Sequence, residues 1–196
     1  CMSSDLSLGA DAFSSALTLY GISLLYAVTG SLTFDGVHSF IDGISQGVVD
    51  GNFNEVIFIS SLFILAGLGF KIAVVPFHAW APDVYQGAPT PVTTLLAAAS
   101  KGMGFIAIFR VFSFTLESVS DEWKLVLGLI ALASMTLGNL AAISQEDIGR
   151  MLAYSSIAQA GYIMIAIPAM TDDAMSGAIA HTLIHAFMKG GAFVVV

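Results

Sequence analysis

Charged side chains are scarce in this sequence, and their scarcity excludes most classes of soluble protein. Only 10% of the 196 residues are Asp, Glu, Lys or Arg, whereas about 25% is usual for a soluble domain. Six Lys and Arg residues against fourteen Asp and Glu residues give a net charge of −8. Such a chain cannot assemble the basic patch that nucleic-acid binding requires. With 57% hydrophobic residues, it is predicted to be an integral membrane protein that lies in a lipid bilayer and binds no nucleic acid.

Cysteine is almost absent as well, because Cys1 is the single one in the sequence. One cysteine excludes a disulfide framework and any cysteine-ligated zinc or iron–sulfur site. The glycine-rich nucleotide-binding motifs and the common hydrolase motifs are also missing. The sequence does not begin with Met, and it stops within a hydrophobic stretch at Val196. We therefore expect an internal piece of a longer protein.

Long apolar runs take the place of these motifs. A membrane-spanning helix needs about 20 mainly apolar residues, and six runs approach that length. The predicted fold is all-α, a polytopic transmembrane bundle of about six helices that forms a single membrane domain over residues 1–196. The more polar stretch 31–54 is predicted to be an extramembrane loop. The runs cover residues 6–29, 55–81, 91–115, 122–143, 147–167 and 173 to the end of the sequence.

Proline interrupts the second of these runs. Pro76 removes a backbone donor and clashes with the preceding turn, and Pro82, Pro89 and Pro91 follow it. Interrupted helices at membrane depth are tolerated only where they are buried in protein or line a wet cavity. They often mark ion sites in transporters. We therefore predict a helix that is broken near Pro76.

Five titratable side chains lie inside the apolar runs, namely Lys71, Lys101, His181, His185 and Lys189. A charged group at the centre of a lone helix costs at least about 2.5–3.5 kcal/mol on insertion scales, so these groups are predicted to face the bundle interior or water. His181, His185 and Lys189 are spaced by four residues, which places them on one stripe at heights about 6 Å apart. Two imidazoles and a desolvated lysine on one stripe can pass protons through bridging water.

Plainer roles stay open for the same side chains. Lys71 could reach the membrane interface if its helix ends at the proline. The stripe could simply tie helices together by hydrogen bonds. We expect that role, rather than proton transfer, for four polar residues of the run 147–167, namely Tyr154, Ser155, Ser156 and Gln159.

A metal or haem on His181 and His185 is disfavoured. Metal-ligating histidines usually rest on a carboxylate or carbonyl partner, and no carboxylate stands close to them in their run. The ammonium group of Lys189, four residues further on, would also repel a cation. We therefore expect no metal site and no bound cofactor in this chain.

Several motifs resemble the antiporter-like membrane subunits of respiratory complex I, with the subunit N group the most similar. The longest and most specific motif is GFKIAVVPFHAWAPDVYQGAPTPV at residues 69–92. The others follow the same order in both, and the resemblance covers about residues 13–193. They are LLYAVTG at 24–30, ASK at 99–101, GNL at 138–140 and IGRMLAYSSI at 148–157.

The resemblance implies a longer bundle with two inverted repeats, each containing a broken helix, and a hydrophilic axis through the membrane. Lys71 corresponds to the lysine of the first broken helix, and Lys101 corresponds to the lysine of the helix that follows it. His181, His185 and Lys189 resemble the His-rich helix of archaeal-type subunits and of multisubunit cation/proton antiporters. The family's glutamate in an earlier helix would precede residue 1, and the lysine of the second broken helix would lie beyond residue 196.

The function that the resemblance implies is proton translocation in a quinone oxidoreductase driven by NADH or a related donor. This chain would be a subunit of that enzyme, in the plasma membrane of a prokaryote, without a redox active site of its own. Other membrane subunits of complex I are the expected partners, flavin and iron–sulfur clusters are expected in partner subunits, and quinone is handled by the assembled complex. The alternatives are a subunit of a multisubunit sodium/proton antiporter and a structural scaffold for assembly.

Overall fold

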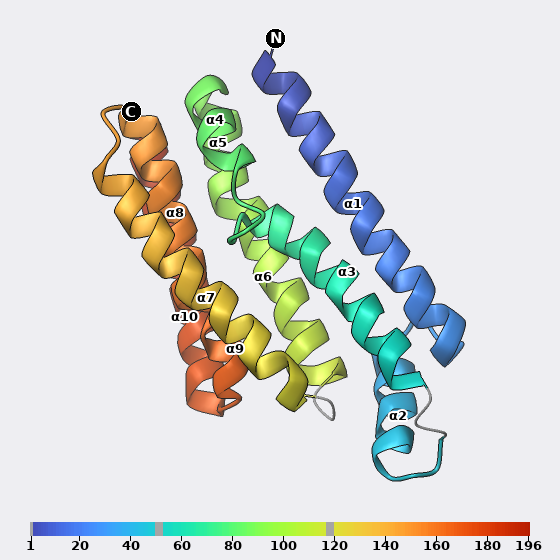
Figure 1. Cartoon of the computed structure of the whole chain (residues 1–196). Coiled ribbons are helices and arrows are strands. Elements are labelled where there is room, and N and C mark those ends of the chain that lie inside the picture. The colour runs from blue at the N-terminus through green and yellow to red at the C-terminus, as the bar shows by residue number, and fades with distance from the viewer. Residues whose placement is uncertain (1, 50–52, 117–119) are drawn as a thin grey trace.

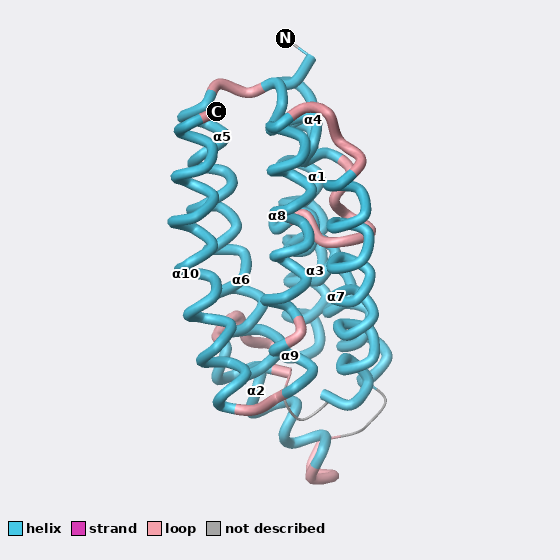
Figure 2. Tube along the Cα trace, turned by 90° about the vertical axis from the view of Figure 1, so that its left-hand side faces the viewer, coloured by secondary structure: helices cyan, strands magenta, loops and turns pink. Residues whose placement is uncertain are grey.

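The structure is a computed structural model that describes residues 2–49, 53–116 and 120–196, and throughout these residues the regular structure is helical. Figure 2 shows the helices joined by short loops, and both ends of the chain lie at the same end of the bundle. The predicted all-α fold is confirmed. The helices are α1 (Met2–Thr29), α2 (Phe34–Ser45), α3 (Asn54–Ile72), α4 (Trp80–Gly87), α5 (Thr90–Leu95), η2 (Leu96–Ser100), α6 (Lys101–Phe109), η3 (Arg110–Thr115), α7 (Ser120–Ile143), α8 (Ile148–Met164), α9 (Ala166–Ala169) and α10 (Asp172–Val195).

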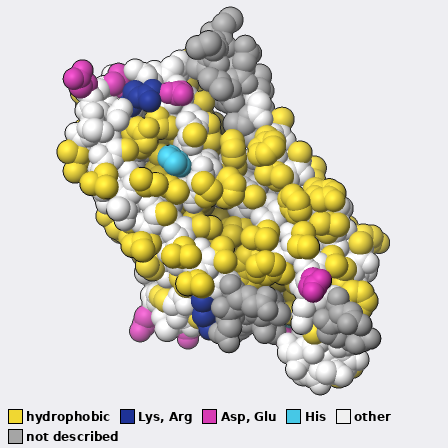
Figure 3. All heavy atoms as spheres, in the orientation of Figure 1, with side chains coloured by type: hydrophobic (Ala, Val, Ile, Leu, Met, Phe, Trp, Pro, Cys, Tyr) yellow, Lys and Arg dark blue, Asp and Glu magenta, His cyan; other side chains and the backbone are white. Residues whose placement is uncertain are grey.

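Among the described residues, six helical segments are long and apolar enough to cross a membrane. Two of them are compound, because α5, η2, α6 and η3 follow one another without a break and α9 continues α8. Figure 3 shows the matching surface, a wide apolar band with charged side chains gathered toward its two ends. The chain is therefore a membrane protein with the predicted number of spans. These segments are Ala12–Thr29, Asn54–Ile72, Thr90–Thr115, Trp123–Ile143, Ile148–Ala169 and Asp172–Val195.

The polar stretch 31–54 contains a helix, α2, that the sequence analysis did not single out. Thr33 caps it, because its hydroxyl accepts a hydrogen bond from the Gly36 N–H at 3.2 Å, which satisfies one of the free donors of the first turn. Two apolar side chains, Val37 and Ile41, are buried. In both views α2 lies at one end of the bundle (Figures 1 and 2). Its location outside the membrane stays a prediction.

The second span is broken where the sequence predicts it. After Ile72 the chain turns at Ala73, which has a left-handed backbone with φ of 59°, and α4 begins at Trp80. The free backbone groups of the break find partners inside the protein: the Val75 N–H donates to Ser134 Oγ of α7 at 3.0 Å, and Trp80 Nε1 donates to the Phe70 carbonyl at 2.9 Å. Figure 1 shows the break at mid-height in the bundle. Irregular backbone at that depth is stable because protein groups replace water.

Small residues let α7 and α8 approach closely. A Cβ atom added at Gly138 of α7 would lie 2.5 Å from the Ala158 nitrogen of α8, and one added at Gly161 would lie 2.7 Å from the Ala131 carbonyl oxygen. Membrane helices associate through such small-residue contacts. In lipid there is no hydrophobic driving force between helices, so close van der Waals packing must hold them together. The pair α7 and α8 is therefore held together at the backbone, and this contact fixes how α8 presents its other face.

This contact predicts opposite effects for the same substitution at two glycines of α7. Gly138→Ala should lower the stability of the full-length protein by about 1–3 kcal/mol, because the new methyl group overpacks the interface. Gly128→Ala is the matched control: a Cβ at Gly128 meets no atom within 4 Å, so the better helix propensity of alanine should leave the stability unchanged or raise it by up to about 1 kcal/mol. The measurement is the midpoint temperature at which the detergent-solubilised protein unfolds, and equal midpoints for both variants would contradict the close packing.

Candidate functional site

A buried group of polar side chains lies where α6, α8 and α10 meet. Lys101 is the first residue of α6 and directly follows the π-helical segment η2, a distortion that often accompanies functional sites. Its side chain is 1% exposed, and His185 and Lys189 of α10 are 2% and 6% exposed. All three reach toward α8, and their partners there are Ser155 and Ser156. The structure therefore gathers these predicted side chains around one helix.

Lys101, Ser156 and His185 form a continuous chain of contacts. The Lys101 ammonium donates a hydrogen bond to Ser156 Oγ at 2.7 Å, and His185 Nε2 lies 3.4 Å from the same oxygen. A hydroxyl can accept one hydrogen bond while it donates another. Ser156 is fully buried, so it links a primary amine to an imidazole away from bulk solvent.

The other two members of the α10 stripe also bind α8. Lys189 Nζ donates to Ser155 Oγ at 2.8 Å and to the Leu152 carbonyl at 3.1 Å. His181 Nε2 pairs with Gln159 Oε1 at 2.7 Å. Along α10 the stripe from His181 to Lys189 spans about 12 Å. The spacing of four residues thus places the three titratable groups on three successive turns of α10, and each of them contacts a polar group of α8.

An aromatic ring covers the other side of Lys101. Its ammonium nitrogen lies 5.7 Å from the centroid of the Tyr85 ring, which belongs to α4 and is 3% exposed. A cation over an aromatic face is attracted by the ring quadrupole. The Tyr85 ring in turn meets Phe193 of α10 edge to face, with centroids 5.4 Å apart. Lys101 is therefore held between a hydroxyl on α8 and a ring on α4.

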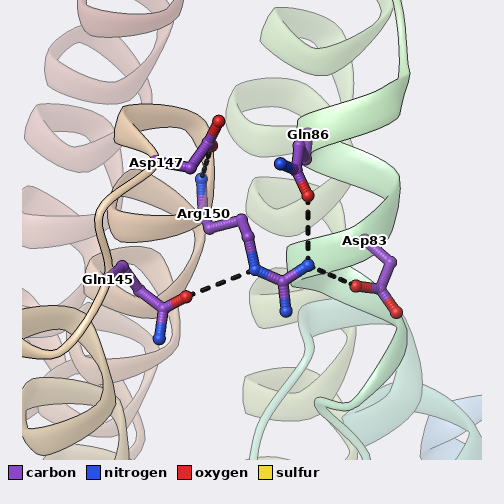
Figure 4. Close-up of polar contacts among 5 residues, drawn as sticks. All are labelled: Asp83, Gln86, Gln145, Asp147 and Arg150. Carbon is purple, nitrogen blue, oxygen red and sulfur yellow. Dashed lines mark hydrogen bonds and ion pairs between the residues drawn. The ribbon is translucent and has the colours of Figure 1, made fainter.

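Arg150, near the start of α8, joins that helix to α4. Its guanidinium contacts Asp83 Oδ1 at 2.5 Å and Gln86 Oε1 at 3.1 Å, both on α4, and Gln145 Oε1 at 3.2 Å. Its backbone N–H donates to Asp147 Oδ1 at 2.8 Å, so Asp147 caps α8. Figure 4 shows the guanidinium between the two helices with its acceptors on either side.

Lys71 does not join this group. It is the last residue but one of α3, and its side chain is exposed on the bundle. Its Cγ lies 4.0 Å from the position that a Cβ on Gly104 of α6 would occupy, so its stem packs along α6. The role of Lys71 in a relay stays a prediction.

Two hollows approach the buried chain from opposite directions along α10. One, of about 310 Å³, reaches His181, and the other, of about 180 Å³, is bounded by Tyr85 and Phe193. Both are large enough to hold water. The rest of the first lining is Tyr162, Ile165, Ala166, Ala169, Ala174, Gly177 and Ala178. The rest of the second is Gln86, Ala88, Thr90, Thr93, Asp147, Gly149 and Val196.

The sequence analysis did not identify the α8 residues that contact the predicted titratable side chains. The sequence analysis expected Ser155, Ser156 and Gln159 only to tie helices together, yet each contacts a titratable side chain. Their positions at 155, 156 and 159 on one helix were the available signal, because polar residues within an apolar span usually face a polar partner. Tyr85 and Arg150 lay inside motifs but had no assigned role. Among the described residues, no group of three or more His, Cys, Asp or Glu side chains could hold a metal.

Comparison with known proteins places this geometry in a family. Residues 3–196 match the membrane domain described as NADH:quinone oxidoreductase/Mrp antiporter, TM. The chain belongs to this family. The resemblance inferred from the motifs, including that to the subunit N group, is therefore confirmed.

Curated relatives of the NADH:quinone oxidoreductase/Mrp antiporter family carry subunit N names. The F(420)H(2) dehydrogenase subunit N of Methanosarcina mazei is 46% identical over 181 residues, which are 92% of this chain and 35% of that protein. The NADH-quinone oxidoreductase subunit N of Desulforamulus reducens is 43% identical over 183 residues, 93% of this chain and 37% of that protein. The chain thus spans little more than a third of the length of these relatives.

A solved structure in the same family has the same fold. Respiratory complex I from Thermus thermophilus with bound Aureothin contains a chain that superposes with a TM-score of 0.77 at 34% identity. The match covers 100% of this chain and 40% of that one. The helices of this chain are therefore arranged as in the matched part of that chain.

The burial of Lys101 predicts that the subunit keeps it at a cost in stability. Its hydrogen-bond partner is a neutral hydroxyl, which does not offset the removal of an ammonium from water. Lys101→Leu should therefore raise the stability of the full-length subunit by about 1–3 kcal/mol. Phe105→Ala, in the same helix at 0% exposure, should lower it by about 3–5 kcal/mol. Heat denaturation of the purified full-length protein measures both, and a destabilised Lys101→Leu variant would make Lys101 a structural residue.

Proposed function

We propose that this chain carries part of the proton path of an antiporter-like subunit N in a quinone oxidoreductase driven by NADH or a related donor. The observation that carries the proposal is the buried sequence of contacts from Lys101 through Ser156 to His185. Titratable groups inside an apolar bundle are costly and mark ion or proton pathways. Membership of the family and the names of the relatives support the same conclusion.

The contacts suffice for a balanced proton transfer. The Lys101 ammonium gives its proton to Ser156 Oγ as the Ser156 hydroxyl proton passes to His185 Nε2, so that a neutral amine and an imidazolium replace an ammonium and an imidazole. From His185 the proton can move to a neighbouring group of the stripe through a bridging water. Because Lys101, His185 and Lys189 lie close together in an apolar interior, their protonation states are coupled. A proton that arrives at one group therefore favours release from another.

The redox chemistry belongs elsewhere in the proposed complex. The relatives' names are those of oxidoreductase subunits, and we place flavin and iron–sulfur clusters in partner subunits, with no cofactor in this chain. Other membrane subunits of the complex are the neighbours of this one, and the assembled complex handles quinone. We place the complex in the plasma membrane of a prokaryote, because the two relatives compared come from an archaeon and a bacterium.

Removal of Lys101 tests the proton path. In the full-length subunit within its complex, Lys101→Met should lower proton pumping at least about tenfold, because the chain of contacts loses a proton-accepting group. Lys101→Arg should fail equally, since a guanidinium keeps the charge but does not give up its proton. Lys124→Met, at the start of α7, removes a lysine outside the polar group and should pump normally. Pumping is measured as acidification per quinone reduced in sealed vesicles.

The outcomes separate the relay from a structural role. Normal pumping by Lys101→Met in a fully assembled complex would remove Lys101 from the path, and recovery in Lys101→Arg would show that only the charge is needed. Lys71→Met, in the same assay, should also lower pumping if the family correspondence holds. A normal result there would confine the path to α6, α8 and α10.

A sodium/proton antiporter is the second candidate, because the matched family includes Mrp antiporters. The two functions require different partners, so the complex purified around the full-length subunit distinguishes them. The oxidoreductase predicts flavin and iron–sulfur absorbance that is bleached by the electron donor. Sodium-driven proton exchange by a colourless complex would favour the antiporter instead.

A further inference from the structure

Near the Tyr85 end of helix α4, the Tyr85 side chain is not held by a hydrogen bond of its own in the described part of the chain. It has eight residues, and its N-terminal end is tied to α3 by the hydrogen bond from Trp80 to the Phe70 carbonyl. The Tyr85 hydroxyl is buried and has no hydrogen-bond partner in the described part of the chain. The ring above Lys101 is therefore placed by the position of α4 and by packing against Phe193, not by a hydrogen bond of the phenol.

Arg150 ties this part of α4 to α8 through side-chain contacts. Asp83 and Gln86 are three residues apart on α4, so they share a face, and the same terminal nitrogen of Arg150 contacts both. Its Nε contacts Gln145, just before α8. A planar guanidinium with five donors can hold such a set of acceptors, whereas an ammonium has no fixed fork.

The contacts of Arg150 with Asp83 and Gln86, here called the Arg150 clamp, set the distance between the two groups that contact the Lys101 ammonium, the Tyr85 ring and the Ser156 hydroxyl. Tyr85 lies between Asp83 and Gln86 on α4, and Ser156 lies on the same helix as Arg150, fewer than two turns further on. A shift of α4 away from α8 would move the ring off the ammonium and leave the hydroxyl in place.

We propose that Arg150 is a positioning residue for proton transfer at Lys101: by clamping α4 to α8 it holds the Tyr85 ring against the Lys101 ammonium. This inference rests on the proposed proton path. It assigns Arg150 no contact with the transferred proton, because its guanidinium contacts Asp83, Gln86 and Gln145, with Tyr154 also beside it, and not Lys101.

The test is a double-mutant cycle in the full-length subunit within its complex, read as protons pumped per quinone reduced. Arg150→Gln and Tyr85→Leu should each lower this ratio at least about fivefold, because a cation–π contact contributes more at a desolvated site than at an exposed one. The combined variant should be no worse than either, because both remove the same contact. Tyr85→Phe keeps the ring and should therefore restore most of the ratio that Tyr85→Leu loses. Arg110→Gln, a matched arginine that packs on Phe34 and Phe114 instead, should pump normally.

Subunit content and quinone reduction, measured on the same membranes, separate positioning from folding. If Arg150→Gln does not assemble, Asp83→Asn takes its place in the cycle, since it removes the ion pair from the α4 side. Losses that multiply in the combined variant would overturn the role of Arg150, as would a normal ratio for Arg150→Gln. The proposed function fails separately, when Lys101→Met pumps normally.

Discussion

An ammonium group in an apolar interior must be held by whatever polar groups the protein places there, and here those groups are neutral. Lys101 and Lys189 meet serine hydroxyls, a carbonyl and an aromatic ring, and in the part of the chain that the structure describes neither forms an ion pair. A carboxylate partner would lock the positive charge in place. Hydroxyls stabilise it less and can themselves carry a proton onward. The choice of partners thus suits groups that must gain and lose protons repeatedly.

Helix α8 makes this arrangement possible because different parts of its surface contact different neighbouring helices. One side is built of small residues, Ala158 and Gly161, and packs on the backbone of α7. Another carries Ser155 and Ser156, which meet the titratable groups of α6 and α10. Its N-terminal turn reaches α4 through Arg150. One helix therefore connects the broken span, the buried lysines and the rest of the bundle.

Much of this could be predicted from the sequence. The spans follow from the length of the apolar runs, the break follows from Pro76, and the common stripe of His181, His185 and Lys189 follows from their spacing. The contacts of Lys101 with Ser156 and Tyr85 could not be derived, because they join segments far apart in the chain. The exposure of Lys71 was equally out of reach, since the rotation of a helix uniformly rich in apolar residues leaves no periodic signal. Helix α2 was missed because its polar residues favoured a loop.

The glycine contacts between α7 and α8 also bear on how the bundle could move during the proposed proton transfer. Helices whose backbones are in direct contact have no layer of side chains between them over which to slide. We therefore expect α7 and α8 to move together as one rigid unit. Helix α10 contacts α8 through long side chains, whose rotamers can change without displacing the helix. Water would then enter and leave the space around the polar side chains of α10 as their rotamers change. The helices α7 and α8 would stay in place, and the membrane spans would rearrange little.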